Sequence, residues 1–239
     1  MTDIDLRLFG TTEALVSDAA GLLGQLLGRA LTERGRASLV LSGGSSPKPV
    51  YEALAKQDLA WDGVGIGLVD ERWVPSGHAA SNADFIQACF DGTPAARAQF
   101  MPLYNGHETP SAGLDAAEQA LALLAQPFDI CVLGMGSDSH TASWFPDSRG
   151  LAEALDPDNP ATLAAVDAAG CPGAGEITDR ITLTASAVLT ARHAVLLLPS
   201  QEKLDVFRAA MTRPVEDAPV RTLLDLGSRL SVFALETDR

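Results

Sequence analysis

Short apolar runs alternate along the chain with longer stretches in which apolar residues recur every three or four positions. The first pattern is typical of buried β-strands and the second of helices packed on a sheet. Strands are predicted at residues 6–9, 37–41, 64–69, 130–133, 181–184, 194–198 and 230–235. Helices are predicted at residues 13–34, 47–56, 81–90, 111–126, 201–211 and 220–226, with another near Ala142. A strand followed by a helix, repeated in this way, predicts an α/β fold.

The predicted strands lack the polar alternation of a half-exposed sheet, and residues 194–198, for example, read Ala-Val-Leu-Leu-Leu. Such strands are typical of a mostly parallel sheet with helices on both faces, so we expect a three-layer, Rossmann-like doubly wound architecture. With 239 residues and no internal repeat or linker, the chain is predicted to form a single domain over residues 1–239. Residues 156–175, rich in Pro, Gly, Asp and Ala, show no periodicity. We expect a loop there, either one that closes over a ligand or a plain surface loop.

The strand at 37–41 runs directly into the sequence SGGSSP at residues 42–47 and then into a helix. Glycines at such a junction leave backbone N–H groups exposed near the positive end of a helix dipole, which favours a phosphate. Gly43, Gly44 and Ser45 are therefore candidate phosphate-binding residues, although a Gly-Gly-Ser sequence alone is more often an ordinary turn. Neither the dinucleotide pattern G-x-G-x-x-G nor the P-loop pattern occurs here, which argues against a nucleotide cofactor.

Polar residues follow two other predicted strands at the same edge of the expected sheet, where α/β proteins bind their ligands. Asp70 and Arg72 come after the strand at 64–69, and Asp138 and His140 lie in the glycine-rich segment 134–146. His140 is a candidate general base for activating water, with Asp138 holding the imidazole by a hydrogen bond. A purely structural role for His140 is an equally good interpretation of the pattern.

Cations near the predicted strand ends stand out in a chain whose net charge is −14. Arg72 follows one strand, Arg180 directly precedes another, and Lys203 lies at the start of the helix after residues 194–198. Guanidinium and ammonium groups both bind phosphate oxygens, although each of these side chains, taken singly, is more commonly a solvated surface charge. His78 is interpreted as a surface or capping residue.

Composition and motifs argue against several classes of protein. No apolar run reaches the roughly 18–20 residues needed to span a membrane, and the acidic chain has no basic cluster for nucleic acid. The amino terminus lacks a secretory signal and the three cysteines are widely spaced, so a reducing cytoplasm is the expected location. Spacings typical of zinc ligands and the G-x-S-x-G motif are absent, which favours catalysis without metal or covalent intermediate.

Together, these segments resemble the 6-phosphogluconolactonase family, within the broader group that includes glucosamine-6-phosphate deaminases. The resemblance is carried, in the family's order and spacing, by residues 41–47, 70–75 with 81–82, 134–146, 180–184 and 200–203. It implies a deaminase-like α/β fold and hydrolysis of 6-phospho-D-glucono-1,5-lactone to 6-phospho-D-gluconate, the second step of the oxidative pentose phosphate pathway, without a cofactor. It also implies that His140 helps water attack the lactone and protonates the departing ring oxygen. The candidate substrate-binding residues are Gly43, Gly44, Ser45, Asp70, Arg72, Arg180 and Lys203.

The chain departs from the family pattern at Ser139, where members usually have Gly between the acid and the histidine. If this position requires a positive φ, Ser costs about 1 kcal/mol and can shift the histidine. Alternatively, Ser sits in an ordinary conformation and offers a hydroxyl.

Two other functions remain open from the sequence. A glucosamine-6-phosphate deaminase-like isomerase shares the glycine loop, but its usual Asp-Glu-Tyr motif differs from Asp70-Glu71-Arg72, which favours the lactonase. A sugar-phosphate-binding module without turnover is the second alternative. The expected partner is a small sugar-phosphate lactone, with neither nucleic acid nor membrane. The sequence leaves the oligomeric state open, with a monomer slightly favoured.

Overall fold

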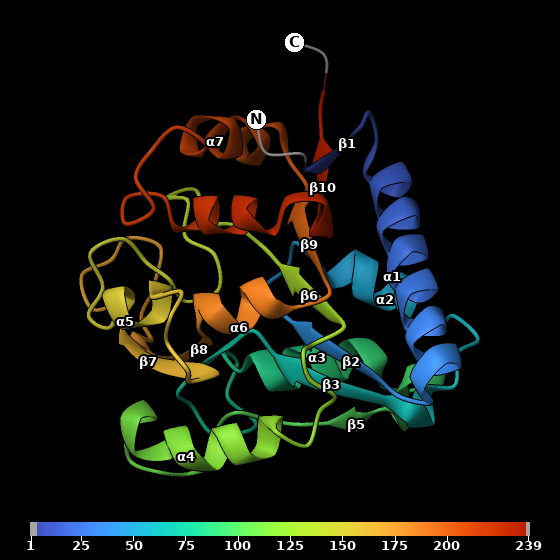
Figure 1. Ribbon diagram of the computed structural model, residues 1–239, viewed down its shortest axis with the longest axis horizontal. Helices are drawn as coiled ribbons and strands as arrows, with labels where there is room; N and C mark the ends of the chain where they lie inside the picture. The colour runs from blue at the N-terminus through green and yellow to red at the C-terminus, as the bar shows by residue number, and fades with distance from the viewer. Residues whose placement is uncertain (1–3, 238–239) are drawn as a thin grey trace.

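A seven-stranded, entirely parallel sheet forms the centre of the computed structural model, which describes residues 4–237 (Figure 1). In spatial order its strands are β1 (Asp5–Phe9), β10 (Leu230–Leu235), β9 (His193–Leu198), β6 (Ile130–Leu133), β2 (Ala37–Leu41), β3 (Val64–Leu68) and β5 (Gln99–Phe100). Every neighbouring pair is parallel. All residues of β2 and β6 are buried, which is the physical reason why every residue of these two strands except Ser38 is apolar.

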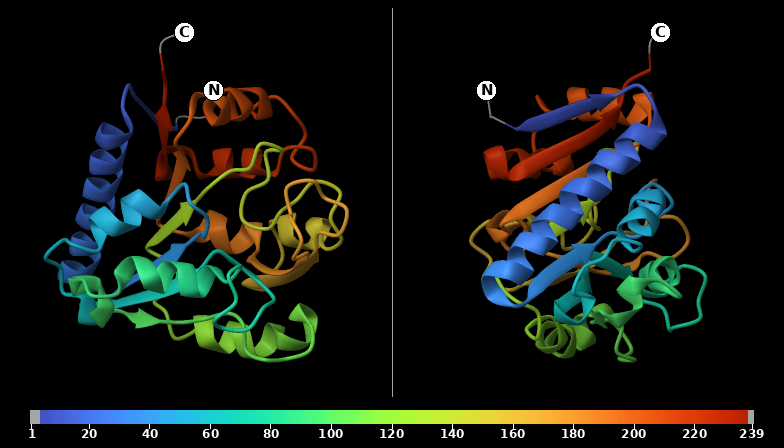
Figure 2. Two further views of the ribbon diagram at one scale, coloured as in Figure 1. Left: turned by 180° about the vertical axis from the view of Figure 1, so that it is seen from behind. Right: turned by 90° about the vertical axis from the view of Figure 1, so that its right-hand side faces the viewer.

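Helices cover both faces of this sheet, so the predicted α/β class is confirmed. They are α1 (Thr12–Arg34), α2 (Lys48–Leu54), α3 (Asn82–Phe90), α4 (Pro110–Leu121), α5 (Leu151–Leu155), α6 (Ala185–Thr190) and α7 (Gln201–Ala210). The 3₁₀ segments are Trp61–Gly63, Pro94–Arg97 and Pro219–Arg229. In Figure 2, α2 and α3 lie in front of the sheet when the molecule is seen from behind, whereas α6 lies on the opposite face. No helix within residues 4–237 is long and apolar enough to cross a membrane.

A second, three-stranded antiparallel sheet was not predicted from the sequence. It consists of β4 (Asp70–Arg72), β8 (Asp179–Leu183) and β7 (Leu163–Asp167). It is joined to the carboxyl edge of the main sheet, because the Val69 backbone N–H donates to Leu41 and the Leu183 N–H donates to Val69. The small sheet therefore brings residues 70–72 and 179–183 to the edge where the parallel strands end.

Two predictions for individual segments are wrong. The stretch 156–175 is not wholly a loop, since residues 163–167 form β7, whose pairing with β8 could not be anticipated from local periodicity. The helix predicted near Ala142 does not form: Ala142 has a φ of 51°, and an isolated antiparallel bridge joins Thr141 to Trp144. A positive φ cannot continue a right-handed helix. The apolar residues there fill the core instead, with Trp144 fully buried.

Candidate active site

A cavity of about 270 Å³ opens at the carboxyl edge of the parallel sheet. Its walls come from the loop after β2, from β4, from the loop after β6, from β8 and from the start of α7. The predicted site residues that line it are Gly43, Gly44, Ser45, Asp70, Arg72, His140, Arg180 and Lys203. Asp138 lies beside this cavity, in contact with His140. The structure thus brings all nine candidates together from segments far apart in the sequence.

The glycine loop keeps its backbone amides available to a ligand. Within residues 4–237, the N–H groups of Gly43, Gly44 and Ser45 donate to no acceptor. Gly44 has a φ of 95°, and a Cβ at Gly43 would lie 1.9 Å from Oδ1 of Asn82 at the start of α3. Glycine is therefore required here both by conformation and by the close approach of a neighbouring element. Open amides beside a cation are a suitable environment for an anion.

His140 and Asp138 form a hydrogen-bonded pair at the rim of the cavity. The Nδ1 of His140 lies 2.5 Å from Oδ1 of Asp138, and the His140 backbone N–H donates to the same oxygen at 3.2 Å. Burial raises the pKa of Asp138, but the hydrogen bonds and charge of His140 outweigh burial, so the net pKa of the carboxyl is lowered. Because Nδ1 is engaged, Nε2 is the ring nitrogen left to meet a ligand. The Phe145 ring packs against the imidazole with 4.2 Å between centroids.

Ser139 has a φ of 66°, which is the left-handed conformation that favours the glycine usually found at this position of the family. Its buried hydroxyl is also used: Oγ donates to the Asp138 carbonyl at 2.5 Å and accepts from Nη1 of Arg213 at 3.2 Å. The Ser139 carbonyl accepts from the Val220 N–H. The ordinary backbone conformation considered for Ser139 is therefore wrong, although its hydroxyl does form hydrogen bonds. A strained backbone is combined with hydrogen bonds that fix the loop carrying His140.

This combination predicts an order of stability for two variants. Ser139→Ala keeps a Cβ at positive φ and loses both hydroxyl bonds, whereas Ser139→Gly loses the same bonds but relieves the backbone. We expect the Ala variant to be less stable than the Gly variant by about 1 kcal/mol. The free energy of unfolding in urea measures the difference. Equal stability of the two variants would show that the positive φ carries no cost.

The three cations reach the cavity in different ways. Nζ of Lys203 donates to Oγ of Ser46 at 3.1 Å, which places the ammonium at the glycine loop, and burial lowers the pKa of this lysine. Arg72 and Arg180 are direct neighbours across β4 and β8. Nη2 of Arg180 donates to the Ala174 carbonyl at 2.5 Å, and its guanidinium lies 5.5 Å from the Phe145 ring centroid. Burial, followed by smaller charge effects, lowers the pKa of Arg180.

Several residues that shape the site were not identified from the sequence. Glu71 is fully buried and accepts from the backbone N–H groups of Arg72, Asn82 and Ala83, so it fixes the start of α3 against β4. The net pKa of Glu71 is raised, because the effect of burial outweighs the lowering by these hydrogen bonds. A Cβ at Gly173 would lie 2.4 Å from Asp138, so the segment after β7 covers the acid. Glu71 stands between Asp70 and Arg72, two residues that were identified as candidates, and this position was the only indication of its role in the sequence. The role could not be inferred because β4 was not predicted.

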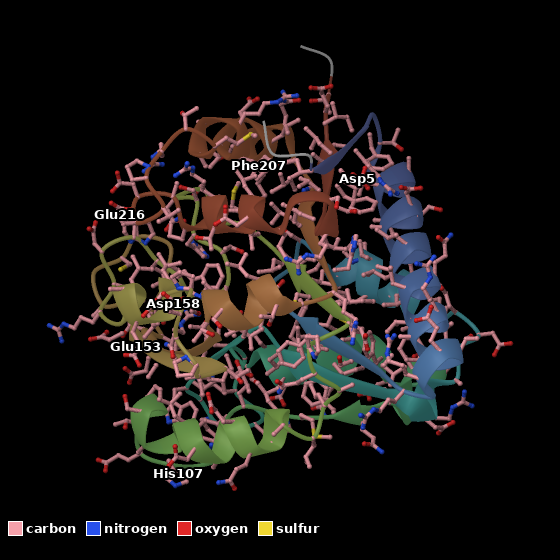
Figure 3. The ribbon with its side chains drawn as sticks, in the orientation of Figure 1. Asp5, His107, Glu153, Asp158, Phe207 and Glu216 are labelled. Atoms are coloured by element: carbon pink, nitrogen blue, oxygen red, sulfur yellow. The ribbon has the colours of Figure 1, made fainter. Side chains whose placement is uncertain are left out.

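Asp70 is held by two partners. Ser143 Oγ donates to Oδ2 of Asp70 at 2.6 Å, and the amide of Asn82 donates to the Asp70 carbonyl at 2.9 Å. The other histidines lie elsewhere. His78 is exposed and accepts from the Ala80 N–H, and His107 is at the molecular surface beside α4 (Figure 3). The structure therefore leaves His140 as the histidine of this cavity among the described residues.

Comparison with known proteins agrees with the fold. Residues 10–231 match the family described as glucosamine-6-phosphate isomerases/6-phosphogluconolactonase, and the chain belongs to that family. It is 38% identical to a 6-phosphogluconolactonase from Rhizobium meliloti over 92% of this chain and 93% of that protein. It is 41% identical to one from Xylella fastidiosa over 88% and 87% of the two chains. A crystal structure of a 6-phosphogluconolactonase from Shewanella baltica, 36% identical, superposes with a TM-score of 0.91 over 98% of both chains.

Proposed function

We propose that this protein hydrolyses 6-phospho-D-glucono-1,5-lactone to 6-phospho-D-gluconate, without metal or cofactor, and that His140 assists the attacking water. The observation that carries the proposal is that one cavity is lined both by His140, which pairs with Asp138, and by the glycine loop with Lys203. A base and an anion-binding site in one cavity suit a substrate with a reactive carbonyl at one end and a phosphate at the other. The names of the similar proteins from Rhizobium meliloti and Xylella fastidiosa support the same reaction.

The reaction requires a proton to be removed and then returned. Nε2 of His140 accepts a proton from water as the water oxygen bonds to C1 of the lactone, and the carbonyl electrons move onto the carbonyl oxygen. When this tetrahedral adduct collapses, the bond between C1 and the ring oxygen breaks and the imidazolium returns the proton to that oxygen. Asp138, whose pKa is lowered, is a carboxylate at neutral pH and stabilises the imidazolium.

Positive charge in the cavity supports both binding and chemistry. The open amides of the glycine loop and the ammonium of Lys203 are proposed to hold the phosphate, which orients the ring from a position remote from C1. Arg72 and Arg180, neighbouring cations on the adjacent wall, add positive potential that favours a dianionic substrate and the negative charge developing on the carbonyl oxygen. Asp70 is proposed to contact the sugar.

A direct assay tests the activity. Purified protein is expected to accelerate the loss of freshly generated lactone above the spontaneous rate, measured as proton release in weak buffer. Glucosamine 6-phosphate supplies the control substrate, because release of ammonia from it would instead support the deaminase-like alternative. Saturable binding of the lactone with no increase in its hydrolysis would contradict the proposal and favour a binding module.

Three further expectations stay predictions. They are the single domain over residues 1–239, the cytoplasmic location and the slightly favoured monomer. The first includes residues 1–3 and 238–239, which lie outside the described part of the chain.

A further inference from the structure

A second cavity, of about 570 Å³, lies at the opposite edge of the parallel sheet, where the strands begin. It is bounded by the last turns of α1, by the segment before β6, by the segment between α6 and β9, and by the residue before β10. It shares no lining residue with the candidate active site. The proposed lactonase reaction assigns it no role.

The lining of this second cavity is basic in an acidic protein. It holds four of the chain's 17 lysines and arginines, namely Arg29, Arg34, Arg192 and Arg229. Its carboxylates are Asp129 and Glu33, so the lining has a net charge of about +2 against −14 for the whole chain. Burial lowers the pKa of the remaining titratable group, His193, which favours its neutral form. A concentration of cations in this setting points to an anionic ligand.

Two of the four guanidinium groups already neutralise the buried acid. Asp129 is 5% exposed, and its Oδ1 accepts from Nη2 of Arg34 at 2.6 Å and lies 3.2 Å from Nε of Arg192. Its Oδ2 accepts from the Ser38 N–H at 2.9 Å, which joins the starts of β2 and β6. Arg34 also pairs with Glu33. This network explains Arg34 and Arg192 as partners of the carboxylates.

The other two guanidinium groups have no carboxylate partner among residues 4–237. Nη1 of Arg229 donates to the carbonyls of Leu189 and Ala191, at 2.9 and 2.6 Å, which holds the group in position while leaving its other N–H donors available. Arg29 makes no hydrogen bond or ion pair with a described residue. A fixed guanidinium and a free one facing the same cavity can both contact a single dianion.

Apolar residues complete the cavity and indicate what else a ligand contains. Leu26, Ala30 and Pro127 line it beside the arginines, and its volume falls within the range of about 300–1,000 Å³ found for small-molecule sites. We propose that this cavity binds a small organic phosphate monoester. The phosphate dianion lies between Arg29 and Arg229, and the organic group packs against Leu26, Ala30 and Pro127.

Calorimetric titration with phenyl phosphate tests the site. The titration uses the Lys203→Ala protein, so that a cation of the first cavity is missing throughout. Adding Arg29→Ala is expected to weaken binding at least about tenfold, the effect of losing one charge-assisted hydrogen bond. Arg29 is exposed and unpaired among the described residues, so the substitution is expected to leave the thermal midpoint unchanged. The matched control is Arg97→Ala, an exposed arginine outside both cavities, which is expected to bind as before.

Three results would overturn the proposal. They are the lack of saturable binding up to about 10 mM phenyl phosphate, equal affinity with and without Arg29, and equal affinity for succinate, a dianion without a phosphate. If inorganic phosphate binds as tightly as phenyl phosphate, the proposed contacts of the organic group with Leu26, Ala30 and Pro127 are wrong. Absence of lactonase activity in the wild-type protein is a separate result. It would contradict the proposed function but not the proposal of a phosphate monoester site in the second cavity.

Discussion

Replacing His140 by alanine is expected to reduce kcat for lactone hydrolysis at least about 10²-fold, the lower range for loss of a general base. The imidazole is held on one side by Asp138 and on another by Phe145, so its Nε2 meets the cavity in a defined orientation. Alanine removes the only imidazole in the described lining of the cavity, and with it the group proposed to accept and return the proton. Initial rates with fresh lactone, corrected for spontaneous hydrolysis, measure the loss.

Two further variants separate catalysis from structure. Asp138→Asn keeps the size of the side chain but removes the charge that stabilises the imidazolium, so we expect a reduction in kcat smaller than that of His140→Ala. His78→Ala serves as the matched control, because His78 is an exposed histidine outside the candidate active site. Wild-type kcat in His140→Ala, or an equal loss in His78→Ala, would remove His140 from the mechanism.

Replacing Lys203 by alanine is expected to raise KM for the phosphorylated lactone by about 10- to 100-fold with a smaller change in kcat. The ammonium is half-buried beside Ser46 at the glycine loop, and this burial disfavours its charged form. A bound phosphate would stabilise the charged ammonium in place of the lost water. Because the phosphate is remote from C1, its contacts are nearly the same in the ground state and the transition state. Steady-state kinetics over a range of lactone concentrations separates the two constants.

The substrate and a second lysine provide the controls for Lys203. Unphosphorylated glucono-1,5-lactone lacks the group that Lys203 is proposed to bind, so any hydrolysis of it should be equally fast in wild type and Lys203→Ala. Lys48 lies at the start of α2, near the same loop, but is exposed and pairs with Glu52 at 3.5 Å. Lys48→Ala should therefore leave KM unchanged. An unchanged KM in Lys203→Ala would contradict the phosphate assignment.

The predicted strands agree well with the observed ones because a strand buried on both faces needs a run of mostly apolar residues, which is visible in the local sequence. The runs 37–41, 130–133 and 230–235 coincide with β2, β6 and β10. The elements missed include β5, a strand of two residues, and α6, a helix of six residues. Two residues form no recognisable apolar run, and six residues make fewer than two helical turns, which is too few to show a helical period. The resemblance to the lactonase family, stated from the motifs, is confirmed by the family match over residues 10–231.

The sequence by itself determined the α/β class, the edge at which ligands are expected and the pairing of Asp138 with His140, because each depends on residues close together in the chain. Only the tertiary structure decided that Arg72 and Arg180 are neighbours, since β4 and β8 pair across more than 100 residues. It also decided the positive φ of Ser139 and the basic cavity around Arg29 and Arg229. These features depend on which elements meet after folding, and that is set by the packing of the whole core rather than by any local pattern.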